Sequence, residues 1–270
     1  CGYHGWHDWY LSTNIGDDAG LDGHLLPGLN PLGVPKGLKH TTFPFNYNDI
    51  EGLHHIIKTK DIGVIKMEVS RYDKPKPGFL EAVRKLANQN NIILIFDECT
   101  SGFRQTFGGL HKLYDVDPDM AMFGKALGNG YAITAVIGKS DIMKEAQNTF
   151  ISSTFWTERI GPTAALKTLE VMKKINSWRF ISSQGAKVKK RWISEGKKNN
   201  LNINTWGLDA LAGFTIKSRD SQKYKTFISQ EMLKKNILAS NSIYFSIKHS
   251  DKILEKYFYY LDRIFKTIGE

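Results

Sequence analysis

Short apolar runs alternate with helix-patterned segments through the middle of this 270-residue chain. Each run is short and mostly apolar, which is typical of a buried strand. Four such runs occur, at residues 62–69, 92–96, 120–123 and 132–137. A helix start is predicted at residues 48–51, before the first run, where a short polar side chain can cap exposed amides. Between the first two runs, residues 78–90 place their apolar side chains on one helical face. This alternation predicts an α/β domain with a mainly parallel sheet.

The C-terminal third has a different pattern. One long helical pattern begins near Pro162 and continues to about Asn199. After it, residues 212–216 read as a strand, and two later segments, 222–235 and 251–268, read as amphipathic helices. We therefore expect a large domain over residues 1–175 and a smaller α+β domain over residues 176–270, joined through the long helix.

The composition excludes several classes of protein. Hydrophobic residues make up 41% of the chain and charged residues 24%, as in ordinary globular proteins. No apolar run approaches the roughly 20 residues needed to cross a bilayer, and the start shows no signal-peptide pattern. The two cysteines, Cys1 and Cys99, form no CxxC pair. We expect a cytoplasmic enzyme without a membrane partner.

The net charge of +10 does not predict a nucleic-acid partner. The basic residues concentrate in one stretch of helical spacing, and no RNA-binding or helix-turn-helix pattern accompanies them. They are Lys187, Lys189, Lys190, Arg191, Lys197 and Lys198. A solvated helix face is the better interpretation of such a stretch.

Two polar residues stand where a ligand site is expected. Asp97 follows the strand at residues 92–96, and Lys125 follows the strand at residues 120–123 and Gly124. Ligands of open α/β sheets bind beyond the carboxyl ends of the strands. A carboxylate there is poorly solvated and needs a partner, and a desolvated lysine amine can attack an aldehyde to form a Schiff base.

Each residue alone also has a structural interpretation. An aspartate at a strand end is more often a cap or an ion-pair partner, and a lysine in a glycine-rich loop is usually a surface residue. The loop is not a phosphate-binding P-loop, because Ala126 stands where a Ser or Thr would follow the lysine. The two residues become specific only together.

Together, the runs DECTSGFR at residues 97–104 and GKALGNG at residues 124–130, with Asp97 and Lys125 28 positions apart, resemble one family. They are similar to the class III, fold-type-I pyridoxal-phosphate (PLP) aminotransferases, and most similar to the glutamate-1-semialdehyde 2,1-aminomutase-like branch. Further similar segments lie at residues 1–10, 33–49, 78–98 and 152–172. The resemblance weakens after about residue 200. It implies the aspartate aminotransferase fold and a PLP-dependent transfer of an amino group between a small-molecule donor and a carbonyl acceptor.

The resemblance also implies roles for individual residues. Lys125 would hold PLP as a Schiff base and then move the substrate proton, and Asp97 would pair with the pyridine nitrogen. Tyr3 would stack on the cofactor ring with His4 close by. Cys99 would pack on the opposite face, where the family usually has an aliphatic residue.

Three further residues follow from the same resemblance. Ser153 and Thr154 would bind the cofactor phosphate of the neighbouring subunit, which implies a homodimer with shared active sites. Glu68 matches the position where the family has Glu-Pro, although Val69 replaces the proline here. The family's main phosphate-binding loop lies upstream of its Tyr-His-Gly segment, and these 270 residues contain no such loop. We expect that the N-terminal part of the family's domain is missing and that PLP binding is weaker without it.

Several alternatives stay open on the sequence alone. An aminotransferase and an aminomutase fit equally well. Arg219 and Arg263 read as surface residues, so a substrate without an amino-acid carboxylate, such as a keto sugar, is not excluded. A catalytically impaired fragment that acts only as a dimerising or binding module is the rival from another class. A metal site is not predicted, because neither His54-His55 nor the pair His4 and His7 has a third ligand at metal spacing.

Overall fold

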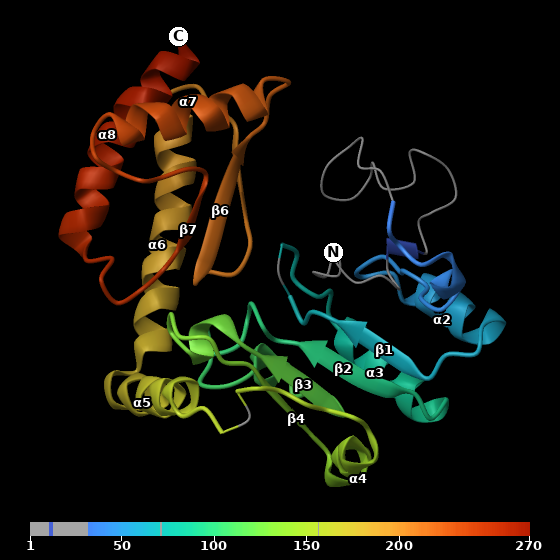
Figure 1. Cartoon of the computed structure of the whole chain (residues 1–270). Coiled ribbons are helices and arrows are strands. Elements are labelled where there is room, and N and C mark those ends of the chain that lie inside the picture. Colours follow the sequence, from blue (N-terminus) through green and yellow to red (C-terminus); the bar gives the residue numbers. More distant parts are fainter. Residues whose placement is uncertain (1–10, 13–31, 71, 156) are drawn as a thin grey trace. The chain divides into compact units, whose positions relative to one another are not determined.

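The computed structural model describes residues 11–12, 32–70, 72–155 and 157–270 of the chain (Figure 1). Tyr3 and His4 lie outside these residues. The chain forms two compact units, which we describe separately. The first contains residues up to Met67 together with Pro75–Leu94, and the second contains Glu68–Lys74 together with Ile95–Glu270.

The first unit contains helices, a strand and the start of a second strand. Its elements are η1 (Lys36–Leu38), α2 (Ile50–Thr59), β1 (Val64–Met67), α3 (Phe79–Gln89) and the start of β2 (Ile93–Asp97). The predicted helix start is confirmed, since the amide of Gly52 donates to Asp49 Oδ1 at 2.9 Å and so caps α2. The predicted apolar face of α3 is buried through Phe79, Leu80, Val83 and Ala87.

The second unit holds most of the larger sheet. Strand β2 pairs in parallel with β3 (Met120–Phe123), and β3 pairs in antiparallel fashion with β4 (Ala135–Gly138). The hydrogen-bonded order of the strands is β1, β2, β3 and β4. The expected α/β class is therefore confirmed, with an antiparallel strand at one edge. On β3, Ala121 and Phe123 are buried with Leu127 and Ala165.

The expectation of one long helix from about Pro162 to Asn199 is wrong. The chain forms two helices instead, α5 (Ile160–Ile175) and α6 (Ser177–Lys198). Asn176 separates them in the left-handed conformation, with φ 52°, and its amide donates to Met172 O. Asparagine enters this conformation more readily than most residues, and helices commonly end on it.

A smaller antiparallel sheet follows α6. It consists of β5 (Ile203–Trp206), β6 (Leu211–Ile216) and β7 (Ser242–Tyr244), and it is accompanied by α7 (Ser221–Leu233) and α8 (Asp251–Gly269). Helix α6 packs against β5, β6 and α8, as Figure 1 shows. The core between them contains Trp192, Phe214, Phe258, Leu261 and Phe265. The boundary between a domain of residues 1–175 and one of 176–270 stays a prediction.

The basic stretch on α6 is partly neutralised by neighbouring carboxylates. Two of its residues pair with carboxylates of α8. Lys198 Nζ lies 2.9 Å from Asp262 Oδ1, and Arg191 pairs with Glu255. Lys187, Lys190 and Lys197 are exposed. The stretch is therefore a solvated helix face, as its spacing predicts. Within the described part of the chain, no helix has the length and apolar character needed to cross a membrane.

Candidate active site

Asp97 and Lys125 lie at the same edge of the larger sheet. Strands β2 and β3 run parallel with Asp97 opposite Met122, so both strands end there, and Lys125 follows β3 after Gly124. The Asp97 side chain is only 7% exposed. Its Oδ1 accepts a hydrogen bond from the amide of Cys99 at 3.1 Å, which turns the chain away from the strand.

The Lys125 amine reaches across to the loop that follows Asp97. Lys125 Nζ donates to Thr100 Oγ1 at 3.1 Å and lies 3.4 Å from Cys99 Sγ. Lys125 also has a left-handed backbone, with φ 45°. This conformation costs a non-glycine residue about 1 kcal/mol, and such strain is concentrated at functional sites.

Gly124 is required by the close approach of these two loops. A Cβ atom at Gly124 would lie 2.9 Å from Cys99 Sγ, which is closer than packed atoms tolerate. Any larger residue would therefore displace either the Cys99 loop or the backbone of Lys125. The glycine keeps the cysteine and the lysine amine side by side.

A second carboxylate, Glu98, holds the loop that follows β2. Glu98 is fully buried, and its Oε1 accepts from the backbone amide of His111 at 2.9 Å and lies 2.9 Å from His111 Nδ1. The Ser101 hydroxyl donates to Glu98 Oε2. These bonds tie both ends of the loop from residue 98 to 111 together. The sequence did not single out Thr100, Ser101 or His111, because their partners are fixed by the path of the loop.

The other predicted site residues have separate positions. Glu68 is buried directly after β1. Ser153 and Thr154 are exposed on a turn between η4 (Lys144–Asn148) and α5, where Ser153 Oγ accepts from the amide of Phe155 at 3.1 Å. The described structure thus brings Asp97, Cys99 and Lys125 together.

Lys125 opens onto a cleft of about 980 Å³ within the second unit. Its walls come from the loop after β3, from α5 and from residues 244–247, which begin with the last residue of β7. Asp97, Cys99, Ser153 and Thr154 do not line it. The charged side chains in the lining are all basic. They belong to Arg104, Lys125, Arg159 and Lys167.

Arg104 is the basic residue most firmly held in the cleft. Its Nε donates to the backbone oxygen of Thr100 at 2.8 Å, and its guanidinium carbon lies 5.4 Å from the centre of the Tyr244 ring. Burial lowers the pKa of the Arg104 guanidinium, and Tyr244 and Cys99 act in the opposite direction. Arginine nevertheless stays charged in proteins.

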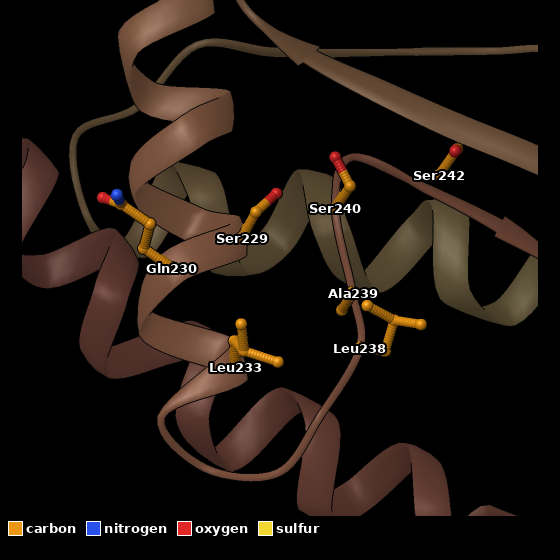
Figure 2. Close-up of a pocket in the computed structure, with 7 residues that line it drawn as sticks. All are labelled: Ser229, Gln230, Leu233, Leu238, Ala239, Ser240 and Ser242. Atoms are coloured by element: carbon orange, nitrogen blue, oxygen red, sulfur yellow. The ribbon is translucent and has the colours of Figure 1, made fainter.

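A second, smaller pocket lies between the end of α7 and the segment that leads into β7 (Figure 2). Seven residues line it: Ser229, Gln230, Leu233, Leu238, Ala239, Ser240 and Ser242. None of these side chains titrates near neutral pH, so this pocket is poorly suited to proton transfer. Among the residues that the structure describes, no group of three or more His, Cys, Asp or Glu residues is placed to hold a metal ion.

Comparison with known sequences supports the resemblance seen in the motifs. Residues 72–241 match the family model Aminotransferase class-III. The 3-aminobutyryl-CoA aminotransferase of Cloacimonas acidaminovorans is 32% identical over 100% of this chain and 64% of its own length. The glutamate-1-semialdehyde 2,1-aminomutase of Thermodesulfovibrio yellowstonii is 28% identical over 98% of this chain and 66% of its own length. The chain thus spans slightly less than two thirds of the length of these relatives.

Solved structures show the same fold. A transaminase with PLP bound superimposes with a TM-score of 0.83 at 18% identity, covering 99% of this chain and 66% of that one. The FumI protein of Sphingopyxis sp. MTA144, solved with PLP, also gives 0.83 at 18% identity, covering 90% of this chain and 61% of that one. The fold is therefore that of the fold-type-I PLP-dependent transferases, as the motifs predicted. The family model matches well over half of this chain. The chain therefore belongs to the class III aminotransferases.

Proposed function

We propose that this protein transfers amino groups with pyridoxal phosphate, which Lys125 holds. One observation carries the proposal: Lys125 lines a cleft and follows β3 at the sheet edge where the buried Asp97 ends the neighbouring parallel strand. The family as a whole is PLP dependent, and the named relatives include both an aminotransferase and an aminomutase.

The residues present fit this cofactor. PLP offers an aldehyde for an amine and a ring nitrogen for a carboxylate. Lys125 is an accessible amine, and Asp97 is a buried carboxylate next to it in the fold. Gly124 lacks the Cβ atom that would push the two loops apart. These residues match the aldehyde and the ring nitrogen of PLP, and the cofactor phosphate needs donors from elsewhere.

Each residue then has a defined task. When bound, PLP supplies an electron sink for the negative charge that develops at the substrate Cα. Asp97 keeps a proton on the ring nitrogen, because a buried carboxylate favours a cation beside it. Once the substrate amine has displaced it from the cofactor, Lys125 Nζ would take the proton from the substrate Cα and deliver it to the C4′ carbon of PLP. Thr100, whose hydroxyl accepts from Lys125 Nζ, orients the amine between these steps.

The remaining assignments rest on similarity. We propose that Cys99 packs against one face of the ring and that Tyr3 stacks on the other, with His4 and Glu68 nearby. Ser153 and Thr154 stand on an exposed turn, which suits a role toward a neighbouring subunit. A homodimer with shared sites is therefore part of the proposal. A cytoplasmic location stays a prediction.

The substrates are a small-molecule amino donor and a carbonyl acceptor. An aminotransferase needs both, whereas an aminomutase returns the amino group to the molecule that supplied it. The tasks of Lys125 and Asp97 are the same in either reaction. Assays with glutamate semialdehyde alone, and with a panel of keto acids and keto sugars plus glutamate, distinguish the two.

The proposal is tested by the near-visible absorbance of the chain mixed with PLP, before and after reduction with borohydride. We expect a yellow band that Lys125→Ala abolishes, and mass spectrometry should find the reduced cofactor attached to Lys125. Lys139→Ala is the matched control, because Lys139 follows β4 and its amine pairs with Asp119 at 2.7 Å, away from the Lys125 amine. A band unchanged in Lys125→Ala would refute the assignment. A folded dimer without any band would favour a non-catalytic binding module.

A further inference from the structure

We propose that Arg104 binds an anionic group of the substrate, so that this site selects amines and carbonyl compounds bearing a carboxylate or a phosphate. The inference rests on the proposed function, because it assigns a substrate class to the Lys125 cleft. It adds a recognition residue to a site whose predicted residues all serve the cofactor.

The first support is the position of Arg104. It lines the same cleft as Lys125, and its Nε bond to Thr100 O fixes it to the residue whose hydroxyl holds the lysine amine. Both cations thus bond to the same residue, Thr100, and both residues line the same cleft. The loop from residue 98 to 111, held by Glu98 and His111, keeps Arg104 in place.

The second support is the hydrogen-bonding capacity of the guanidinium. It has five N–H donors in a planar fork, and the bond to Thr100 O uses only the one on Nε. The ring of Tyr244 lies 5.4 Å from the guanidinium carbon and can restrict its orientation. The fork geometry matches a carboxylate or a phosphate in two parallel bonds.

The third support is the charge of the cleft. Arg104 forms no ion pair with any carboxylate of the described residues, unlike Lys167, whose amine lies 2.8 Å from Glu170. The lining contains four basic residues and none that is acidic. A partly buried cation in such surroundings favours an incoming anion.

A first experiment tests anion binding without any cofactor. Phenylglyoxal modifies arginine side chains, and mass spectrometry follows its rate at each arginine of the full chain. We expect butanoate or propyl phosphate to slow modification of Arg104, whereas butanol should not. Arg219 and Arg263, both exposed, are controls in the same chain. Equal protection of all three arginines, or none at Arg104, would overturn the proposal. The stronger of the two anions identifies the group that the site prefers.

A second experiment uses the protein with PLP and follows the loss of the visible band on adding amines. We expect 4-aminobutyrate to half-saturate the wild-type protein at a concentration roughly tenfold lower than 1-aminobutane, the gain typical of a charge-assisted hydrogen bond. Arg104→Gln should remove this preference, so that the two amines half-saturate the variant at similar concentrations. Arg219→Gln should change nothing. If Arg104→Gln keeps the preference, the inference fails while the band still supports the proposed function. If the wild type has no band, the proposed function fails and the protection experiment alone decides the role of Arg104.

Discussion

Asp97 and Glu98 are adjacent buried carboxylates that have different hydrogen-bond partners. Asp97 accepts from the amide of Cys99 and ends its strand at the edge where Lys125 lies. Glu98 points into the protein, is fully buried and is bound by His111 and Ser101. The first is thus placed for chemistry, and the second holds the loop that carries Cys99, Thr100 and Arg104. Substitutions at the two positions should separate activity from stability.

Asp97→Asn should lower amino transfer by about 10²- to 10³-fold, because a neutral amide no longer favours a proton on the ring nitrogen. The amide oxygen can still accept from Cys99 N, so the free energy of unfolding should change little. Steady-state rates and urea unfolding measure the two quantities. A variant with near-normal rates would contradict the role given to Asp97.

His111→Ala should destabilise the protein by about 1–3 kcal/mol, because the buried Glu98 loses a partner. His55→Ala, at an exposed position, is the control. Adding Glu98→Gln to His111→Ala should recover part of the loss, and the double-mutant cycle from urea unfolding gives the coupling. Strictly additive losses would show that the two side chains act independently.

The sequence singled out the two residues to which we assign the chemistry, and it did not single out the residues that contact them. Asp97 and Lys125 each follow a readable strand, and the spacing between them identifies the family. Thr100 and Arg104 stand in a loop without periodicity. Their contacts with Lys125 and Tyr244 depend on the path of that loop and on segments far along the chain. No local pattern encodes such contacts.

Most of the helices and strands could also be predicted from the sequence, and a few could not. Strands β2, β3 and β6 and helices α2, α3, α7 and α8 occur where the apolar periodicity places them. The break at Asn176 was missed, because the periodicity continues across it and a single left-handed residue leaves no gap in the pattern. Strands β5 and β7 are short and only partly buried, so they lack a strong alternation.

The contact between α6 and α8 should weaken in acid. A hydrogen bond from Arg191 lowers the pKa of Glu255, and bonds from Asn199 and Lys198 lower the pKa of Asp262. A carboxylate whose pKa is depressed by folding stabilises the folded state above its unfolded pKa of about 4, and this stabilisation is lost as the pH falls through the folded value.

The test is the urea midpoint, followed by circular dichroism from neutral pH to below pH 4. We expect the midpoint of the wild type to fall more steeply in this acid window than that of the double variant Glu255→Gln and Asp262→Asn. Because Glu255 is exposed and Asp262 is partly exposed, the difference should shrink at high salt. Parallel curves would show that these ion pairs contribute nothing measurable.

At the scale of the whole molecule, the proposed homodimer would build each active site from two copies of the chain. Ser153 and Thr154 do not line the cleft of their own chain, although the family resemblance assigns them to the cofactor phosphate. A second copy would reconcile these facts. The motifs alone suggested such a dimer, but folding patterns within one chain cannot specify a surface between two.

Mixing two inactive variants tests this arrangement. Lys125→Ala removes the amine, and Thr154→Glu places a negative charge where the phosphate of the neighbouring site would bind. In a random mixture, half of the dimers contain one copy of each variant, and each of these has one intact site. We therefore expect about a quarter of wild-type activity to return. A mixture as inactive as its components would mean that each site is built from one chain.

The buried Glu98 also constrains how this sequence can diverge over time. Removing one member of a buried hydrogen-bonded pair is costly, whereas replacing both by apolar groups of similar shape can be almost neutral. A lineage that alters His111 first is at a disadvantage until Glu98 changes as well. We therefore expect these positions to vary in tandem among descendants of this protein, while exposed neighbours such as Lys112 drift freely. The hydrogen bonds that hold this loop in place thus also link the substitutions that the two positions can accept.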